Sequence, residues 1–176
     1  MTARILFLLI QAYDSRVVKK QKGKIMVKPI FHFGLTDDAK LIREEVFVKK
    51  QGFAKEFDEK DAQAWHLVLY LDNVAISTGR IVEVDPETYQ VGRVAVRKNF
   101  RHMKVGTYTV KFLCNKALSL GARKAILAAQ VDKMGFYKSI GFRPYPDGEV
   151  FYDEGVPHIM MYKVLIRKKN GYKPFY

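Results

Sequence analysis

The chain has 176 residues, of which 48% are hydrophobic and 28% are charged, and its formal net charge is +13. This length and composition are typical of one globular domain and exclude an intrinsically disordered chain. The single cysteine, Cys114, excludes an intramolecular disulfide framework and a cluster of cysteine metal ligands. The longest purely apolar run, Ile5–Ile10, is far shorter than the ~18 residues of a membrane span. We therefore expect a cytoplasmic protein with no membrane partner.

The positive charge is concentrated at the ends of the chain. Residues 1–25 hold six Lys or Arg and one acid, and residues 163–176 hold five and no acid, whereas residues 26–162 hold 20 basic and 17 acidic groups. This nearly neutral body weakens the hypothesis of a nucleic-acid-binding protein. Residues 88–131 are the exception, with nine basic residues and no acid, and such a local positive field suits a small polyanion.

The first 25 residues have the composition of a basic extension and allow three interpretations. The residues 22–24, Lys-Gly-Lys, can be encoded by a purine-rich tract just before the Met26 codon, which in a bacterium would make Met26 the true start of translation. The alternatives are a floppy functional tail and a secretory signal, although no typical cleavage site follows the apolar run. Residues 167–176 form a second basic tail.

The first half of the body predicts strands joined by tight turns. A strand over 27–33 contains Pro29, which favours the edge of a sheet. Thr36 can cap a helix from Asp37 to about Lys50, and a polar, acidic loop or irregular helix follows over 51–64. Strands are predicted over 65–71, 74–84 and 91–96, the first two joined by the turn Asp72-Asn73.

The second half predicts a helical crossover. A charged loop over 99–105 precedes a helix over 106–120, which Gly121 ends. Its predicted buried side holds Tyr108, Phe112, Leu113, Ala117 and Leu120. A buried strand over 124–130, a helix that Asp132 caps and that runs through Ser139, and strands over 142–145 and 156–166 complete the chain. Antiparallel hairpins followed by a strand–helix–strand crossover predict a mixed α/β domain.

One segment of this pattern predicts an anion site. Residues 94–107 read as a strand, a basic loop and the beginning of a helix. Because unpaired N–H groups and the positive end of the helix dipole meet at a helix N-terminus, such a site binds phosphate. The alternative is a solvated basic loop.

Two motifs resemble the GNAT superfamily of N-acetyltransferases. Arg101, Val105, Gly106 and Thr107 match its pyrophosphate-binding loop, although Lys104 stands where the first glycine of that loop is usual. Residues 135–142 are similar to its F-Y-x-x-x-G-F signature. Residues 46–51, the loop with Asp58 and Asp61, His66 and residues 149–159 resemble the ElaA-like branch, in which a glutamate is usual at the position of Lys50.

The resemblance implies a fold, a co-substrate and a binding site. It implies a single α/β domain over 26–166, with a mixed, mostly antiparallel sheet that splays at strands four and five and is flanked by helices. It also implies that acetyl-CoA binds, with the backbone of Val94 and Val96 pairing with the pantetheine arm. The residues it places at the co-substrate are Val94, Ala95, Val96, Arg101, His102, Met103, Lys104, Val105, Gly106, Thr107, Gln130 and Phe136.

The implied reaction is direct transfer of an acetyl group to a small-molecule or peptidyl amine. Tyr137 is the candidate general acid for the departing thiolate, with packing over the co-substrate as its alternative role. The candidate bases are Glu45, Asp61, His66 and His158, or a water that they hold, although for each histidine alone a structural role is the better interpretation. The acidic stretch 56–61 favours a cationic acceptor such as a polyamine, unless its acids are simply solvated.

Several alternatives stay open. The lysine at position 50 keeps a non-catalytic acyl-CoA-binding sensor as the second hypothesis, and the chain leaves open whether it acts alone or as a homodimer. Cys114 is expected to pack in the core rather than to act as a nucleophile. No group of residues has metal-ligand spacing, so we expect no metal.

Overall fold

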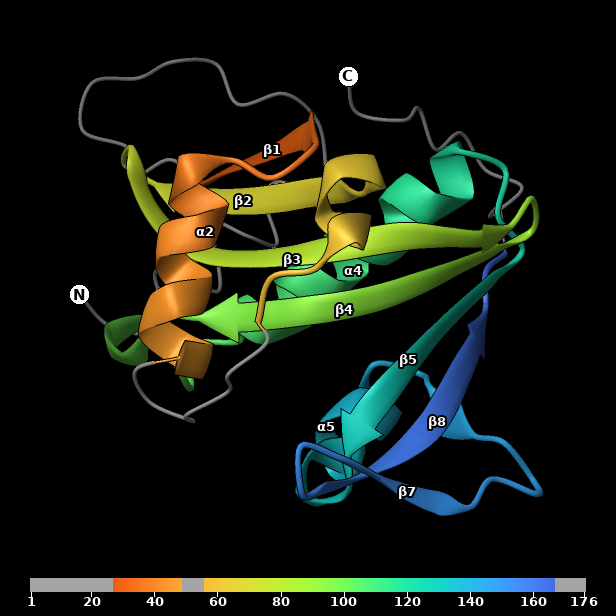
Figure 1. Cartoon of the computed structure of the whole chain (residues 1–176). Helices are drawn as coiled ribbons and strands as arrows, with labels where there is room; N and C mark the ends of the chain where they lie inside the picture. The colour runs from red at the N-terminus through yellow and green to blue at the C-terminus, as the bar shows by residue number, and fades with distance from the viewer. Residues whose placement is uncertain (1–26, 49–55, 167–176) are drawn as a thin grey trace.

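The structure is a computed structural model that describes residues 27–48 and 56–166 (Figure 1). The predicted extension at 1–25, the predicted tail at 167–176 and the lysine at position 50 lie outside the described residues. Within the described ranges, none of the helices is long and apolar enough to cross a membrane.

Eight strands of the described chain form one mixed sheet. The first four strands pair antiparallel in chain order, and the fourth then pairs in parallel with the fifth. The last strand, β8, pairs antiparallel with β5, β6 and β7. The sheet is therefore mixed and mostly antiparallel, as predicted. Its strands are β1 (Val27–Phe33), β2 (Trp65–Leu71), β3 (Val74–Asp85), β4 (Thr88–Val96), β5 (Lys124–Gln130), β6 (Arg143–Pro144), β7 (Val150–Asp153) and β8 (Val156–Val164).

The early strands lie where the sequence predicts them. β1 is an edge strand of the sheet, which suits Pro29 because proline has no N–H to give to a second neighbour. Asp72 and Asn73 have φ values of +47° and +68°, the left-handed pair of a two-residue hairpin turn. β4 begins at Thr88, three residues before the predicted start, because residues 88–90 pair with β5.

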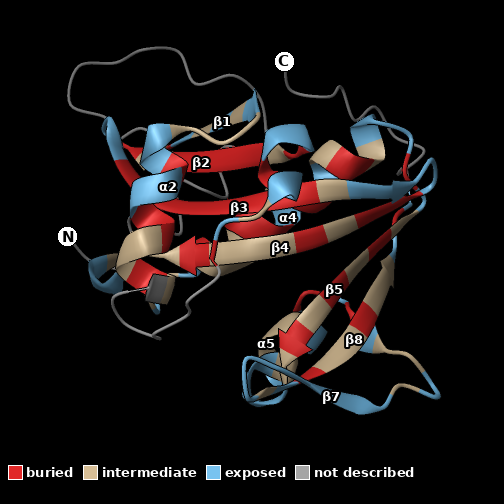
Figure 2. Ribbon diagram, viewed as in Figure 1, coloured by how far each residue is buried: buried red, intermediate tan, exposed pale blue. Residues whose placement is uncertain are grey.

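Helices cover the two faces of the sheet. α2 (Asp37–Arg43) lies in front of β2–β4 in Figure 1 and α4 (Val105–Ser119) lies behind them. The Thr36 hydroxyl accepts a hydrogen bond from the Ala39 N–H at 3.3 Å, so the predicted cap of α2 is confirmed. Successive strand side chains point to opposite faces, so Val68 packs with α2 and Leu67 packs with α4. Figure 2 shows β2 and β3 buried along most of their length between these two layers.

Two predictions of helix geometry were wrong in part. The helix predicted over 37–50 ends at Arg43 and continues as a π-helical turn, η1 (Glu44–Val48), because apolar spacing over five residues cannot separate i→i+4 from i→i+5 bonding. α4 begins at Val105, one residue early, and Leu120 is exposed rather than on the buried side. That side consists of Val105, Thr109, Val110, Leu113, Cys114 and Ala117.

Three further local differences concern short elements. The acidic segment contains a 3-10 helix, η2 (Glu59–Gln63). Asp132 does not cap a helix but pairs with the adjacent Lys133 ammonium, and residues 131–133 form a 3-10 turn, η4, before α5 (Met134–Ser139). β7 was not predicted, because all four of its residues are exposed and it shows no alternation of polar and apolar positions.

Candidate active site

Strands β4 and β5 diverge from a common end. They pair only over residues 88–90 and 124–126, and Figure 1 shows them separating from there toward their carboxyl ends. Within the described chain, the edge of β4 that faces β5 therefore pairs with no strand over residues 91–96. An extended ligand can add its own hydrogen-bonding groups to such an edge. The predicted splay between the fourth and fifth strands is confirmed.

The loop after β4 is tied to the end of that strand and leads into the helix start on which the predicted anion site depends. The Arg101 Nε donates a hydrogen bond to the Val96 carbonyl at 3.0 Å, which ties the loop to the end of β4. His102 and Lys104 have φ values of +61° and +59°, so Lys104 adopts the left-handed conformation that glycine accepts more easily. No side chain caps α4, which leaves the N–H groups of its first turn directed at the loop.

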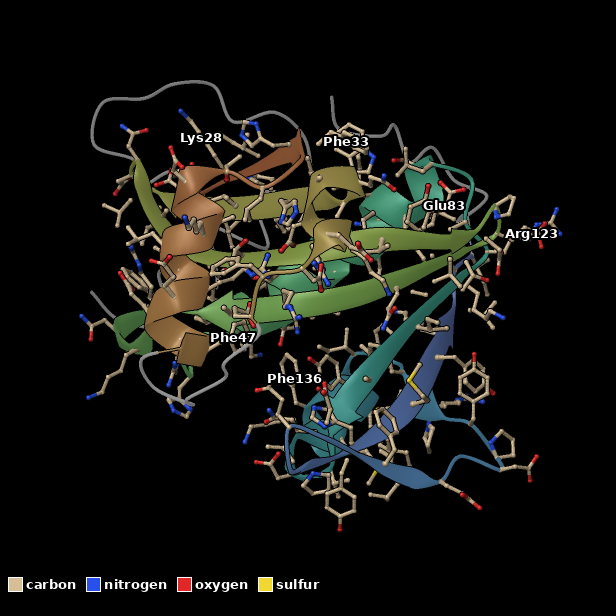
Figure 3. The ribbon with its side chains drawn as sticks, in the orientation of Figure 1. Lys28, Phe33, Phe47, Glu83, Arg123 and Phe136 are labelled. Carbon is tan, nitrogen blue, oxygen red and sulfur yellow. The ribbon has the colours of Figure 1, made fainter. Side chains whose placement is uncertain are left out.

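The F-Y motif lies against this loop although it is about 30 residues further along the chain. An added Cβ on Gly106 would lie 3.4 Å from the Phe136 Cζ and 3.6 Å from the Val96 Cγ2, so α5, the start of α4 and the end of β4 meet at one point. Figure 3 shows the Phe136 side chain on the side of α5 that faces β4. These distances are ordinary van der Waals contacts, so the three elements pack together at position 106.

Tyr137 lies beside Phe136 with a partly buried ring. Its ring packs edge-on against Phe136 and Phe142, with centroid distances of 5.0 and 6.1 Å. Its hydroxyl has no hydrogen-bond partner within the described residues. Burial raises the pKa of Tyr137 to about 12, so the hydroxyl keeps its proton at neutral pH. The group can therefore donate a proton to a base that forms beside it.

The other residues predicted to bind the co-substrate differ in how far their side chains are buried. The side chains of Ala95 and Val105 are each 1% exposed and belong to the core, so these positions can offer only backbone groups. Val94 and Met103 are half-buried against core clusters, and Thr107 is half-buried in the first turn of α4. Gln130 ends β5.

The four candidate bases lie in different places. Glu45 accepts hydrogen bonds from the Arg97 Nε and Nη2 at 2.9 and 3.1 Å, at the end of β4. Asp61 and His66 are buried together, and the His66 Nε2 lies 3.0 Å from the Asp61 carbonyl oxygen. Burial lowers the pKa of His66, which keeps its imidazole neutral. His158 is paired in register with Gln130, so it is the candidate base that lies opposite a predicted site residue.

Cys114 is buried in the core, as predicted. Its side chain belongs to the cluster that α4 forms with the sheet. Burial raises the pKa of the thiol to about 11, so almost no thiolate forms at neutral pH. This environment excludes a nucleophilic role for Cys114.

A buried ionic network on the α2 side of the sheet was not predicted. The Arg43 side chain is fully buried and donates to Glu56 Oε1 at 2.6 Å and to Asp61 Oδ1 at 2.7 Å. Arg80 donates from its Nη1 and Nη2 to Asp58 at 2.6 and 2.7 Å, and from Nη1 to Asp61 Oδ1 at 2.5 Å. These acids therefore pair within the protein, which weakens the prediction that residues 56–61 attract a cationic acceptor. The partners are far apart in sequence, and no local pattern pairs them.

The network has a mixed effect on acidity. Burial alone would raise the pKa of Asp61, but the hydrogen bonds and charges of Arg43 and Arg80 outweigh it and lower that pKa to about 2. For Glu56 the effect of burial is the larger, and its pKa is raised. No group of three or more His, Cys, Asp or Glu side chains among the described residues could hold a metal ion.

The model of the acetyltransferase (GNAT) family matches residues 35–142, a range that includes the splayed strands, the loop and the F-Y motif. The chain belongs to the GNAT family of acetyltransferases. It is 37% identical over 128 residues to the uncharacterised N-acetyltransferase YjcF of Bacillus subtilis, and this alignment covers 72% of this chain and 90% of YjcF. It is 30% identical over 105 residues to ElaA of Escherichia coli, covering 58% of this chain and 67% of ElaA.

Solved structures agree with this GNAT assignment. A Lactobacillus plantarum protein assigned as an N-acetyltransferase has a TM-score of 0.73 and 27% identity, over 80% of this chain and 99% of that one. The ElaA crystal structure has a TM-score of 0.68 and 26% identity, over 79% and 99% of the chains. The ElaA-like branch is therefore confirmed. An Elizabethkingia anophelis GNAT structure with acetyl-CoA bound shares the fold, with a TM-score of 0.61 and 17% identity over 82% and 100% of the chains.

Proposed function

We propose that this GNAT protein transfers the acetyl group of acetyl-CoA to a primary amine by direct attack, in the cytoplasm. The observation that carries the proposal is the junction of three elements at Gly106: the unpaired edge of β4, the uncapped start of α4 and the F-Y motif of α5. A pyrophosphate suits the helix start, and an extended amide-containing arm suits the strand edge. The residues present therefore fit acetyl-CoA.

In this proposal, the co-substrate runs along β4 in a direction that follows from the positions of these groups. The pyrophosphate loop, residues 101–107, follows the carboxyl end of β4. An arm that starts there and pairs first with Val96 and then with Val94 runs back toward the point where β4 and β5 meet. The thioester end therefore lies near residue 93. Holding the amine and the thioester together there is the main contribution of the protein to the rate.

Tyr137 supplies the proton in this proposal. As the amine nitrogen bonds to the acetyl carbonyl carbon, the carbon–sulfur bond breaks and the Tyr137 hydroxyl donates its proton to the sulfur. The amine releases its proton to a general base, and that proton returns through water to restore the Tyr137 hydroxyl. Backbone N–H groups on the free edge of β4 stabilise the negative charge that develops on the carbonyl oxygen.

His158 is the general base that the geometry supports best. The His158 Nδ1 lies 2.8 Å from the Val156 carbonyl oxygen, which can only accept a hydrogen bond. Nδ1 therefore carries the proton of the neutral ring, and Nε2 keeps a lone pair that can take a proton from the amine. His66 has the same chemistry but is fully buried, and Glu45 is held by Arg97.

The first test is binding of coenzyme A. Ligands that bind only the folded state raise the melting temperature, so coenzyme A in a thermal-shift titration should do so in a concentration-dependent way. Arg101→Ala should weaken this binding by about 10- to 100-fold, the effect of losing one charged hydrogen-bond donor. Arg123→Ala is the matched control, because Arg123 is exposed at the far end of the sheet (Figure 3) and should leave the shift unchanged. No shift at millimolar coenzyme A would contradict the proposal.

The second test separates the enzyme from a coenzyme A-binding sensor. Tyr137→Phe keeps the ring and its packing but removes the proton, so turnover should fall by about 10²–10⁴-fold while coenzyme A affinity stays unchanged. Thiol release with a panel of amines gives the rate. If Tyr137→Phe turns over at the wild-type rate, Tyr137 is not the general acid. Coenzyme A binding with no reaction across the panel would favour the sensor.

A further inference from the structure

A β-bulge in β4 turns Arg93 toward the α2 side of the sheet. The register of β3 and β4 shifts between the pairs Arg80–Gly92 and Thr78–Ala95, so Arg93 and Val94 together lie opposite one residue of β3. Arg93 has a φ of +52°, which is unusual for a residue with a side chain. Bulges beside active sites commonly re-aim a side chain.

The packing on either side of the bulge confirms the direction of that turn. Val91 and Val94 both contact the core cluster on the α4 side, although residues three apart in a regular strand point to opposite faces. The extra residue is Arg93, whose Nη2 donates to the Asp58 Oδ2 at 3.3 Å on the α2 side. The bulge thus delivers a guanidinium to the α2 side beside the splay.

Arg93 is the member of the ionic network whose hydrogen-bonding capacity is mostly unused. Arg43 and Arg80 are 0% and 7% exposed and make several short hydrogen bonds each. The Arg93 side chain is 30% exposed, and its long bond to Asp58 is the one hydrogen bond it makes within the described residues. Its Nε is buried without a hydrogen bond, 3.6 Å from Glu56. A guanidinium has five N–H donors; one is bonded to Asp58 and the one on Nε is buried, so three Nη donors are available to a ligand.

The acids of the network do not cancel this capacity. Glu56 accepts a hydrogen bond from Arg43 at 2.6 Å, and Asp58 accepts two from Arg80. With Asp61, three carboxylates face the three guanidinium groups of Arg43, Arg80 and Arg93, so the network carries no excess negative charge. A second ammonium group on the acceptor would gain little here, whereas an anion would meet an underused guanidinium.

We propose that the acceptor of this enzyme is a primary amine that also carries a carboxylate, and that the Arg93 guanidinium binds this carboxylate. The inference rests on the proposed function, in which the thioester lies near residue 93. A planar guanidinium matches the two oxygens of a carboxylate and holds it in a fixed orientation. Arg93 is thereby an acceptor-binding residue that orients the amine toward the thioester.

The test compares amines that differ only in the carboxylate. Lysine with cadaverine and phenylalanine with phenethylamine form such pairs. For the wild type, kcat/KM should be at least about tenfold higher for the carboxylate member of a pair, because a charge-assisted hydrogen bond is lost without it. Arg93→Gln should lower kcat/KM for that member by about 10- to 100-fold and leave the other member within about twofold. Arg93→Lys keeps the positive charge but lacks the planar guanidinium, so its kcat/KM for the carboxylate member should lie between those of the wild type and Arg93→Gln.

Binding measurements keep the inference separate from the proposed function. The coenzyme A thermal shift of Arg93→Gln should equal that of the wild type, and Arg123→Gln, on the exposed far end of the sheet, should change neither measurement. Equal use of both members of a pair, or a preference that persists in Arg93→Gln, would overturn the inference. The inference would also be overturned if coenzyme A binds but none of the carboxylate amines reacts or raises the melting temperature further. Loss of the coenzyme A shift itself would instead overturn the proposed function.

Discussion

At the scale of single residues, Lys104 occupies a position that other GNAT loops give to glycine. It has φ +59° and ψ +10°, and it occupies the N-cap position of α4 without a capping hydrogen bond from its side chain. A side chain in this left-handed conformation costs roughly 1–2 kcal/mol, because its Cβ approaches the following carbonyl group. The loop over residues 101–107 nevertheless keeps its shape, since the Arg101 bond to Val96 and the burial of Val105 hold it on both sides.

A pair of substitutions isolates this backbone strain. Lys104→Gly and Lys104→Ala both remove the ammonium group, but only glycine relieves the left-handed conformation. After allowing for the greater entropy of glycine in the unfolded chain, Lys104→Gly should be more stable than Lys104→Ala by about 1 kcal/mol. Urea denaturation of both variants measures the difference. Equal free energies of unfolding would show that residue 104 is not left-handed in solution.

At the scale of elements, α4 packs directly on the backbone of β3. An added Cβ on Gly79 would lie 2.7 Å from the Leu113 Cδ1, 3.4 Å from Val94 and 3.5 Å from Thr109. Gly79 therefore lets α4, the helix that follows the loop over residues 101–107, approach the strand next to the bulge. Leu113 is fully buried, so it has little room to move away.

Alanine at Gly79 should consequently destabilise the fold. Overpacking at a filled site typically costs about 1–3 kcal/mol, so Gly79→Ala should lower the free energy of unfolding by that amount. Gly92 on the adjacent strand has nothing within 4 Å of an added Cβ, which makes Gly92→Ala the matched control. Thermal unfolding should show a lower melting temperature for Gly79→Ala alone. Similar melting temperatures for the two variants would contradict the close packing of α4.

At the scale of the whole molecule, the buried ionic network joins elements that are distant in sequence. It links Arg43 of α2 through Asp61 of η2 to Arg80 of β3, and through Asp58 to Arg93 of β4. Removing one partner of a buried pair is costly because the other charge is left unpaired. The network therefore anchors the acidic segment over the α2 side of the splayed sheet.

This anchoring predicts sensitivity to acid. The pKa of Asp61 is about 2 in the folded protein, below its ordinary value of 3.8, so its pairing stabilises the fold above about pH 4. That contribution, on the order of 2 kcal/mol, should be lost as the pH falls from about 4 to 2. The raised pKa of Glu56 acts in the opposite sense, so the comparison with Asp61→Asn isolates the effect of Asp61. Urea denaturation between pH 7 and 2.5 should show a stability difference that shrinks toward low pH; a constant difference would refute it.

Local patterns in the sequence predicted the early hairpins, the crossover helix and the basic loop that leads into it. These features depend on interactions between residues close in the chain, such as the Asp72-Asn73 turn and the Thr36 cap. The resemblance of the two motifs placed Gly106 and Phe136 in one binding site, and the structure brings these two residues together. Their predicted roles toward acetyl-CoA stay proposals.

Only the tertiary structure decided the surroundings of the charged residues. Residues 56–61 look like solvated acids in the sequence, yet Glu56 and Asp61 are 3% and 5% exposed and pair with arginines 13 to 19 positions away. The same holds for Arg93, whose direction depends on one extra residue in a strand. Charge pairing and bulge geometry arise where distant segments pack together, so local periodicity determined the elements of this protein and their packing determined which charges are left to meet a substrate.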